Sequence, residues 1–523
     1  QDLYNEVVSI ANHLLHLGVK KGDKVAILSA NMPNWGITQF AIANIGAIAV
    51  PILPGFCSTE LQNILEHAEV KVIFVSRLLA KCLEGVKTPF LEHKILINNF
   101  ATMPEGCYQP EDLDKLVPDI NLNNTTPLPE VSIEEEDIAS IIYTSGTTGF
   151  SKGVVLTHKN LVWDARQCRT IQPVDETYRF VSILPMAHTY ENTLGLLLPL
   201  MFGAQVYYLD RVPTPKLLVP AMQKIRPTVV LSVPLIIEKI YKSQVLPKFT
   251  SSKLMSKLYQ FAPARKLFNR LAGKKLMETF GGELKFFGIG GSKLDGTVEQ
   301  FLREAKFPYA IGYGLTETAP MAAGSNPSQT FLQGVGPVME GVQIKINNPD
   351  KSGQGEIWIK GPNVMKGYYK RPELTAETFT EDGWFKTGDL GSFDKKNRLA
   401  IRGRIKTMIL GASGENIYPE EIESIINNFR FVNESLVVEN SGKLVAMVHF
   451  NMEELEKQYQ KLKDQAGNYK EKINDYIEEQ KQELRDYVNA RVNNFSKLQL
   501  VLVQHEPFEK TPTHKIKRFL YCK

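Results

Sequence analysis

The stretch Tyr143-Thr-Ser-Gly-Thr-Thr-Gly-Phe-Ser-Lys-Gly153 is the most informative part of this 523-residue sequence. Its eleven positions hold three glycines, five serine or threonine residues and one lysine. Glycine permits positive φ angles and close approach of the backbone to a ligand, hydroxyl groups donate hydrogen bonds, and lysine adds a mobile positive charge. This composition predicts a loop that wraps a phosphate chain.

The residues around this loop distinguish it from a Walker loop. The spacing G-x-x-x-x-G-K-[ST] is absent. Apolar residues 138–142 precede the loop, and the short β-branched run 153–157 follows it. We therefore expect a strand to leave the loop, where a Walker loop leads into a helix. An ordinary Gly/Ser/Thr turn in a β-hairpin is the alternative interpretation.

Length and charge narrow the class of protein. A chain of this length predicts about three domains of ordinary size, or one large α/β body with a smaller appendage. The formal charge of +4, from 61 basic and 57 acidic residues, gives no reason to expect nucleic acid or an anionic membrane as the main partner. A local, peripheral contact with a membrane remains compatible with this charge.

The cysteines and the apolar stretches bear on location. Five cysteines, widely spaced and never in C-x-x-C order, fit neither a disulfide framework nor a structural zinc site. The most apolar stretches, residues 40–53 and 194–209, are shorter than the about 20 residues that span a bilayer. We therefore expect a cytoplasmic protein without a transmembrane segment, either soluble or peripheral on the inner membrane face.

The first part of the chain alternates between strand-like and helix-like segments. Strand patterns at 24–28, 47–51 and 71–75 are separated by helix patterns at 35–46 and 59–67, which is typical of βαβ units in a layered parallel sheet. Four further strand-like segments continue this pattern, at 181–184, 205–209, 228–232 and 284–289.

The pattern of predicted elements changes towards the C-terminus. Short strands from about Gly334 predict a β-rich module, at 342–346, 355–359 and 398–401. After Lys406 we expect a helix at 415–430, paired strands at 435–438 and 443–450, and a highly charged helical stretch at 452–494. Apolar residues such as Tyr459 and Leu484 recur there at helical spacing, which favours a solvated, partly packed surface element over a partner-binding coil. The predicted fold is α/β, with a large N-terminal domain, 1–405, of layered α/β subdomains that includes the β-rich module at 334–405, and a small α+β domain, 406–523.

Four further strings carry candidate functional residues. They are Gly312-Tyr-Gly-Leu-Thr-Glu-Thr318, Lys386-Thr-Gly-Asp-Leu390, Gly403-Arg-Ile-Lys406 and Thr511-Pro-Thr-His-Lys-Ile-Lys-Arg518. Each alone has an ordinary interpretation: Asp389 suits an Asx turn, and the basic pair and the basic tail suit a solvated surface.

Taken together with the opening loop, these strings resemble the adenylate-forming superfamily of acyl-CoA synthetases, luciferases and peptide-synthetase adenylation domains. The resemblance runs from the first helix to Lys515. It is strongest to the long-chain fatty acyl-CoA synthetases, through strings such as LPMAHTYENT from Leu184 and GEIWIKGPNVMKGYYKRPELTAETF from Gly355.

The resemblance implies a two-step reaction. A fatty acid carboxylate attacks the α-phosphate of ATP, with Mg²⁺, to give an acyl-adenylate and pyrophosphate, and the thiol of CoA then displaces AMP. Because the first step brings an anion against a polyanion, it needs cations and oriented donors. The partners implied are these small molecules, with no nucleic acid.

The resemblance also assigns residues to the first step. Glu317 is the implied Mg²⁺ carboxylate, Thr316 contacts phosphate, and Tyr313 lies against the adenine. The purine is lined by Gly290, Gly291 and Ser292. The implied phosphate loop consists of Thr144, Ser145, Gly146, Thr147, Thr148, Gly149 and Lys152.

Further roles follow from the same resemblance. Asp389 and Arg404 hold the ribose, which one carboxylate can do with its two oxygens. Lys515 bridges the substrate carboxylate and the α-phosphate as the catalytic lysine. His188 borders the acyl pocket, as a gate or packing group in preference to a base.

The small C-terminal domain is implied to rotate between the two steps. Lys406 is the implied hinge, and Ser413 and Gly414 are implied to face the CoA channel. Ser151 stands where the family has proline before the loop lysine, and the loss of that φ constraint loosens the loop.

Two other functions compete with the CoA ligase. A fatty acyl-AMP ligase or an acyl-carrier-protein synthetase passes the adenylate to a carrier-protein thiol or another acceptor. A non-catalytic relative binds acyl groups or nucleotides only, although the presence of Lys152, Glu317 and Lys515 argues against it.

Overall fold

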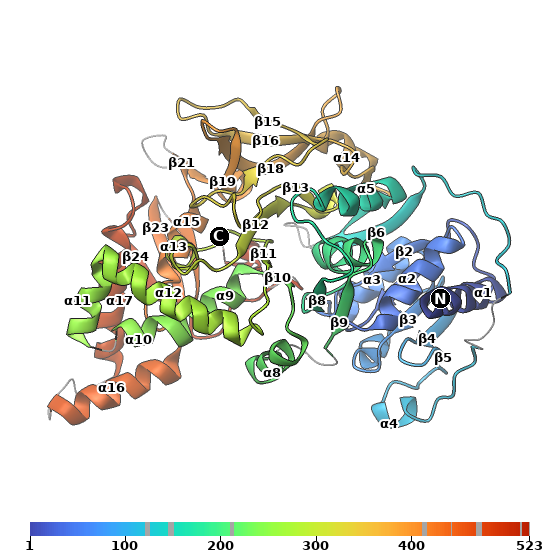
Figure 1. The fold of residues 1–523 in the computed structure, drawn as a ribbon, viewed down its shortest axis with the longest axis horizontal. Helices are drawn as coiled ribbons and strands as arrows, with labels where there is room; N and C mark the ends of the chain where they lie inside the picture. Colours follow the sequence, from blue (N-terminus) through green and yellow to red (C-terminus); the bar gives the residue numbers. More distant parts are fainter. Residues whose placement is uncertain are drawn as a thin grey trace. The chain divides into compact units, whose positions relative to one another are not determined.

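The computed structural model describes residues 1–120, 126–144, 151–209, 214–250, 252–410, 416–440, 442–466, 473–512 and 515–521 (Figure 1). The chain divides into two compact units, which we describe separately. Unit 1 comprises Gln1–Lys345, Trp358–Lys386 and Phe393–Ala400, and unit 2 comprises Ile346–Ile357, Thr387–Ser392 and Ile401–Lys523. The domain boundary expected after residue 405 stays a prediction.

The first sheet of unit 1 has eight strands in the order β17-β7-β6-β2-β1-β3-β4-β5. Its strands are β1 (Lys24–Leu28), β2 (Ile48–Pro51), β3 (Val70–Val75), β4 (His93–Leu96), β5 (Ala101–Thr102), β6 (Ile138–Thr144), β7 (Lys152–Thr157) and β17 (Gly367–Tyr368). Strand β1 runs parallel to both β2 and β3, which confirms the expected βαβ units. The helices between them are α2 (Pro33–Asn44) and α3 (Ser58–Ala68), and α1 (Asp2–His16) packs on α2.

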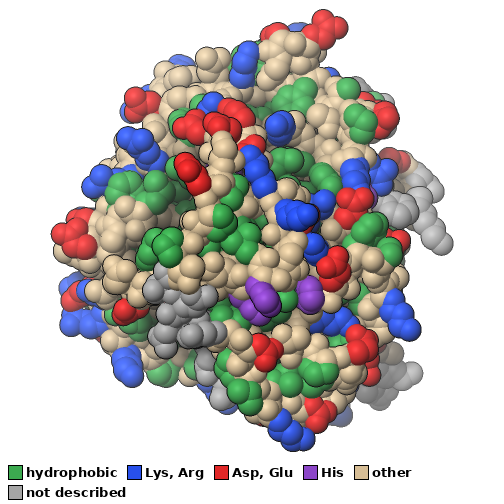
Figure 2. All heavy atoms as spheres, turned by 90° about the vertical axis from the view of Figure 1, so that its right-hand side faces the viewer, with side chains coloured by type: hydrophobic (Ala, Val, Ile, Leu, Met, Phe, Trp, Pro, Cys, Tyr) green, Lys and Arg blue, Asp and Glu red, His purple; other side chains and the backbone are tan. Residues whose placement is uncertain are grey.

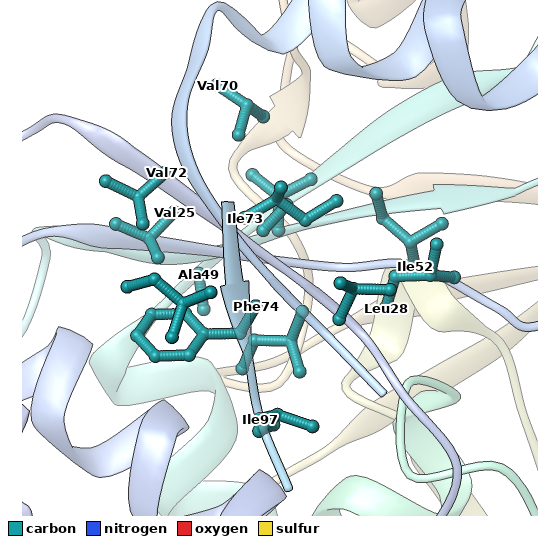
Figure 3. Close-up of a cluster of buried hydrophobic side chains, with 14 of the residues drawn as sticks. Val25, Leu28, Ala49, Ile52, Val70, Val72, Ile73, Phe74 and Ile97 are labelled. Carbon is teal, nitrogen blue, oxygen red and sulfur yellow. The ribbon is translucent and has the colours of Figure 1, made fainter. Parts of the chain in front are cut away.

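The core of this sheet is built from its apolar central strands. Side chains of β1, β2 and β3, including Val25, Ala49 and Phe74, gather in one cluster (Figure 3). The Phe74 ring meets Phe100 edge to face, with ring centroids 6.3 Å apart. Because central parallel strands are covered on both faces, their sequences are near-continuous apolar runs instead of alternating ones.

The later strands form a second sheet, in the order β13-β12-β11-β10-β8-β9, and do not continue the first sheet as the alternating pattern suggested. They are β8 (Arg179–Ser182), β9 (Gln205–Tyr208), β10 (Val229–Ser232), β11 (Phe286–Ile289), β12 (Tyr309–Gly314) and β13 (Met321–Gly324). At the edge of β7, where the next strand along the chain could have been added, β17 pairs instead, at Gly367–Tyr368.

The predicted β-rich texture is also confirmed. A five-stranded sheet has the order β14-β19-β18-β16-β15. Its strands are β14 (Gly336–Pro337), β15 (Gln343–Asn347), β16 (Gly355–Lys360), β18 (Phe385–Phe393) and β19 (Arg398–Arg404).

Unit 2 has its own core. Strand β22 (Val432–Asn440) is antiparallel to β23 (Lys443–Phe450), and β24 (Leu500–Val503) is parallel to β23. Helix α15 (Pro419–Ile426) lies within the predicted 415–430, and the charged stretch holds α16 (Met452–Ala466) and α17 (Ile473–Asn489). Tyr459, Tyr476 and Leu484 are buried in the core, so the helical apolar spacing of this stretch marks a packed face under a charged one.

A membrane-spanning helix is not found in the part of the chain that the structure describes, where every helix is too short or too polar to cross a bilayer.

We predict that Gly281→Ala destabilises the protein more than Gly282→Ala. Both glycines have positive φ, +88° and +79°, so each alanine costs about 1–2 kcal/mol in backbone strain. At Gly281 a Cβ would also lie 2.5 Å from the Met222 carbonyl oxygen and 2.7 Å from Arg226 Cα, whereas at Gly282 it meets nothing within 4 Å. Such overpacking adds about 1–3 kcal/mol. Urea midpoints of the two variants measure the difference, and equal midpoints would contradict the clash.

Candidate active site

The predicted phosphate loop connects two paired strands. Strands β6 and β7 are antiparallel, with Thr144 opposite Lys152 and Tyr143 opposite Gly153. The expected strand after the loop is confirmed. The two strands that flank the loop form a β-hairpin, as in the alternative interpretation. Ser145, Gly146, Thr147, Thr148, Gly149 and Phe150 lie outside the described residues. Gly153 is needed for packing, because a Cβ there would lie 2.9 Å from Ile141 Cγ2.

Tyr368 connects the loop lysine to the predicted magnesium carboxylate. Its hydroxyl donates a hydrogen bond of 2.9 Å to Glu317 Oε1. The Lys152 ammonium lies 5.0 Å from the centroid of the Tyr368 ring, within the range of a cation–π interaction. Burial and, second, the charge of Glu317 raise the pKa of Tyr368, so the phenol stays a donor. The structure therefore brings Lys152 and Glu317 to the same aromatic ring.

Amide side chains hold this arrangement in place. Glu317 belongs to the short 3₁₀ turn η4 (Thr316–Thr318), which also carries Thr316. Asn363, fully buried, donates to the Thr318 carbonyl at 3.1 Å and to the Met321 carbonyl at 2.6 Å. Asn160 in turn donates to the carbonyl oxygens flanking Asn363, at Pro362 and Val364. The turn that carries Glu317 is thus anchored on both sides.

The predicted purine-binding residues lie at the carboxyl edge of the second sheet. Residues 290–292 follow β11, and Tyr313 lies near the end of the parallel neighbour β12. The Gly290 N–H donates to the Ser232 carbonyl at the end of β10. A Cβ on Gly290 would lie 3.3 Å from the Tyr190 ring. Ligands of α/β sheets bind at this edge, which fits a nucleotide base here.

His188 starts a short helix beside these strands. Its Nδ1 accepts a hydrogen bond of 3.2 Å from the Tyr190 N–H, at the start of α6 (Thr189–Glu191). That contact places the proton of the neutral imidazole on Nε2. The ring is half-buried, so the structure holds His188 in a capping and packing position.

Glu191 is a buried carboxyl group that the sequence interpretation did not single out. The Ser182 hydroxyl donates to Glu191 Oε1 at 2.5 Å, and Asn31 donates to the same hydroxyl at 2.8 Å. Gly195 gives the carboxyl room, because a Cβ there would lie 2.6 Å from Oε1. Burial raises the pKa of Glu191 to about 8. An acid three residues before the apolar run at 194–198 was the available signal.

A small apolar cavity lies beside this segment in unit 1. Its volume is about 40 Å³, and every lining group except Gln172 is apolar or a thiol. The lining residues are Cys168, Ile171, Gln172, Val174, Phe180, Leu194, Leu198, Val229, Leu231, Phe286 and Met321. Ligand pockets usually enclose about 300–1,000 Å³, so a long alkyl chain requires these side chains to move.

Unit 2 holds the predicted ribose pair. Arg404 Nε lies 2.9 Å from Asp389 Oδ1, where the Asp389 side chain is only 6 % exposed. Lys406 lies on an exposed 3₁₀ turn, η5 (Ile405–Thr407). Lys515 is exposed, and its backbone N–H donates to the Thr511 hydroxyl. Ser413 and Gly414 lie outside the described residues.

The side chains around Glu317 suit a magnesium ion that is held jointly by the protein and by substrate phosphates. Among the residues that the structure describes, no three His, Cys, Asp or Glu side chains form a cluster that could hold a metal ion. Magnesium is commonly bound by one or two carboxylates together with substrate phosphates. A single carboxylate at Glu317, held by the Tyr368 hydroxyl, fits that mode.

The chain matches the family of AMP-binding enzymes over residues 1–369, so it belongs to this family. It is 27% identical over 570 residues to fatty acyl-CoA synthetase A of Dictyostelium discoideum, covering 98% of this chain and 82% of that protein. It is 29% identical over 494 residues to the long-chain-fatty-acid–CoA ligase FadD15 of Mycobacterium bovis, covering 88% and 79%.

The fold resembles that of a coenzyme A synthetase of known structure. The structure of O-succinylbenzoate coenzyme A synthetase from Bacillus subtilis, in complex with ATP and magnesium ion, matches with a TM-score of 0.74 and 22% identity. The match covers 99% of this chain and 93% of that one.

We predict that Glu191→Gln becomes more stable relative to the wild type as the pH rises from about 5 to about 8. Over this range the buried carboxyl keeps its proton while the same group ionises in the unfolded chain, so the native state of the wild type binds more protons and loses stability with pH. Melting temperatures of both proteins across this range measure the effect. A constant difference would show that Glu191 does not titrate with a raised pKa.

Proposed function

We propose that this chain is an ATP-dependent fatty acid–CoA ligase that forms AMP and pyrophosphate. The observation that carries this is the array of Lys152, Tyr368 and Glu317 beside the phosphate-loop strands, in a member of the AMP-binding family. Relatives that match most of the chain are named fatty acyl-CoA synthetases or ligases, which supports a fatty acid and CoA as the substrates.

In the first step, the enzyme must bring a carboxylate against the α-phosphate of ATP. We assign Lys152 and the loop 144–149 to the terminal phosphates, where a cation and oriented donors offset the repulsion between anions. Glu317 would hold Mg²⁺ and Thr316 a phosphate oxygen. When bound, the ion neutralises charge on the phosphates. The Tyr368 hydroxyl orients Glu317 for this purpose and keeps its carboxylate hydrogen-bonded.

Two sets of residues are assigned to the two parts of the nucleoside, the adenine and the ribose. Tyr313 and residues 290–292 take the adenine through the ring face and the backbone at the sheet edge. Asp389, oriented by Arg404, accepts hydrogen bonds from the ribose hydroxyls. Lys515 stabilises the charge that develops between the carboxylate and the α-phosphate.

The second step requires the thiol of CoA to reach the acyl-adenylate. We assign Lys406 to the hinge, in keeping with its exposed 3₁₀ turn, and Ser413 and Gly414 to the CoA channel. The alkyl chain is assigned to the apolar cavity next to the His188 segment, which offers no competing polar contacts apart from Gln172.

Four described cysteines, Cys57, Cys82, Cys107 and Cys168, are free thiols, which supports the predicted cytoplasmic location.

The proposed function predicts AMP and a fatty acyl thioester from palmitate and MgATP when CoA is present. The assay measures AMP, pyrophosphate and thioester with CoA, with an acyl carrier protein, and with neither. Thioester on the carrier protein and none on CoA would identify a carrier-protein ligase. Absence of pyrophosphate release across short, medium, long and aromatic acids would identify a non-catalytic binding protein.

Lys515→Ala is the control variant for that assay. It should release little pyrophosphate from acid and MgATP, because the developing charge loses its cation, while it still converts supplied acyl-adenylate to thioester. Equal loss of both half-reactions would contradict the role assigned to Lys515.

We predict that Tyr368→Phe raises the concentration of Mg²⁺ needed for half-maximal pyrophosphate release by about tenfold, because the lost hydrogen bond to Glu317 is worth about 1.5 kcal/mol. Tyr369→Phe is the matched control, since it keeps the ring that meets His67 edge to face at 5.7 Å. Its Mg²⁺ dependence should equal that of the wild type. An unchanged Mg²⁺ dependence in Tyr368→Phe would show that the Tyr368 hydroxyl does not support Mg²⁺ binding.

A further inference from the structure

One segment of unit 1 has a charge balance unlike the rest of the chain. Residues 239–277 contain ten lysine or arginine residues and no aspartate or glutamate, so the rest of the chain carries a formal charge of −6. In contrast, the face in Figure 2 shows basic and acidic side chains interspersed. The segment forms helices α10 (Leu246–Thr250), α11 (Lys253–Gln260) and α12 (Ala262–Thr279), drawn in green in Figure 1.

The inner faces of these helices are anchored by the protein itself. The ring of Phe249 stacks on Tyr259 and Phe268, with centroids 4.8 and 5.6 Å apart. On α12, Arg265 forms an ion pair of 2.8 Å with Glu304. The helices are therefore held in place by contacts that do not use their outer faces.

Large apolar side chains lie on the outer faces nevertheless. They are Leu254, Leu258, Phe261, Leu267 and Leu271, with exposed fractions of 69, 40, 62, 59 and 57 %. The two pairs of leucines are each four residues apart, so each pair lies on one side of its helix. Several large exposed apolar side chains on neighbouring helices indicate an interaction surface.

Cations run alongside these leucines. On α12, exposed Lys266, Arg270 and Lys274 repeat every four residues, beside Leu267 and Leu271, and exposed Lys275 follows Lys274. Next to them lies a surface groove of about 540 Å³ to which Lys266, Arg270, Arg303 and Lys306 contribute. The one carboxylate that lines the groove, Glu304, is already paired with Arg265. The groove thus offers a net positive recess for an anionic group.

We propose that α11 and α12 form a docking surface for the headgroup region of an anionic phospholipid bilayer. Leucine and phenylalanine side chains enter the boundary of the acyl chains, and the lysine and arginine side chains contact lipid phosphates. The exposed apolar residues favour a bilayer over nucleic acid, whose backbone needs only the cations. This surface includes none of the residues assigned to the nucleotide, and its test does not depend on the proposed function.

The test measures binding of the whole chain to lipid vesicles. Wild-type protein should cosediment with phosphatidylcholine vesicles that contain about 30 mol% phosphatidylserine, and at least about tenfold less with pure phosphatidylcholine. The variant Lys266→Gln/Arg270→Gln/Lys274→Gln/Lys275→Gln should lose at least about tenfold in affinity for the anionic vesicles. Its control, Lys20→Gln/Lys87→Gln/Lys395→Gln/Lys396→Gln, removes the same charge from exposed lysines elsewhere and should bind like the wild type.

A second pair of variants tests the apolar contact. Leu267→Ser/Leu271→Ser should weaken binding by about tenfold, and Leu78→Ser/Val117→Ser, at positions 63 and 75 % exposed, should not. Circular dichroism confirms that each variant is folded. Equal binding to both vesicle types, or equal loss in a control, would overturn the proposal. Loss of self-association in the leucine variant, without vesicle binding by the wild type, would assign the surface to a second copy of the chain.

Discussion

The hydrogen bond from Tyr368 to Glu317 joins the two large sheets of unit 1. Tyr368 belongs to β17 at the edge of the first sheet, and Glu317 lies on the turn that connects β12 and β13 of the second. The Lys152 ammonium faces the same ring, next to the phosphate-loop strands. Because this contact is half-buried and charged, it is stronger than a neutral hydrogen bond at the surface. Together with the hydrogen bonds of Asn363, it holds the Glu317 carboxylate next to strand β7.

A second polar bridge lies deeper between the same sheets. Asn31 follows β1 and donates a hydrogen bond to the hydroxyl of Ser182, which ends β8. That hydroxyl in turn donates to the carboxyl group of Glu191. The Met186 N–H donates to Asn31 Oδ1, so the segment that carries His188 is tied to the first sheet. Buried polar groups are costly unless they are hydrogen-bonded, and networks of this kind make one arrangement of the backbone strongly preferred.

Local elements could be predicted well where the residues carry a strong pattern. The bounds of β1 and β23 agree with the predicted 24–28 and 443–450, and the strand after the phosphate loop is present. Their apolar and β-branched residues leave few alternatives. The division of the strands into two sheets could not be predicted, because strand-like residues carry no mark of which neighbour they pair with. Strand β17, only two residues long, occupies the edge of β7 from more than 200 residues away.

The residues alone were enough for the phosphate-loop composition, the order of the functional strings and the α/β class, since these depend on side-chain chemistry and short-range spacing. The tertiary structure decided which groups meet. Tyr368 and Glu191 became candidate functional residues only when folding brought one to Glu317 and buried the other beside Ser182. Neither contact is encoded by local spacing, because hydrogen bonding and desolvation depend on neighbours that the chain supplies from distant segments.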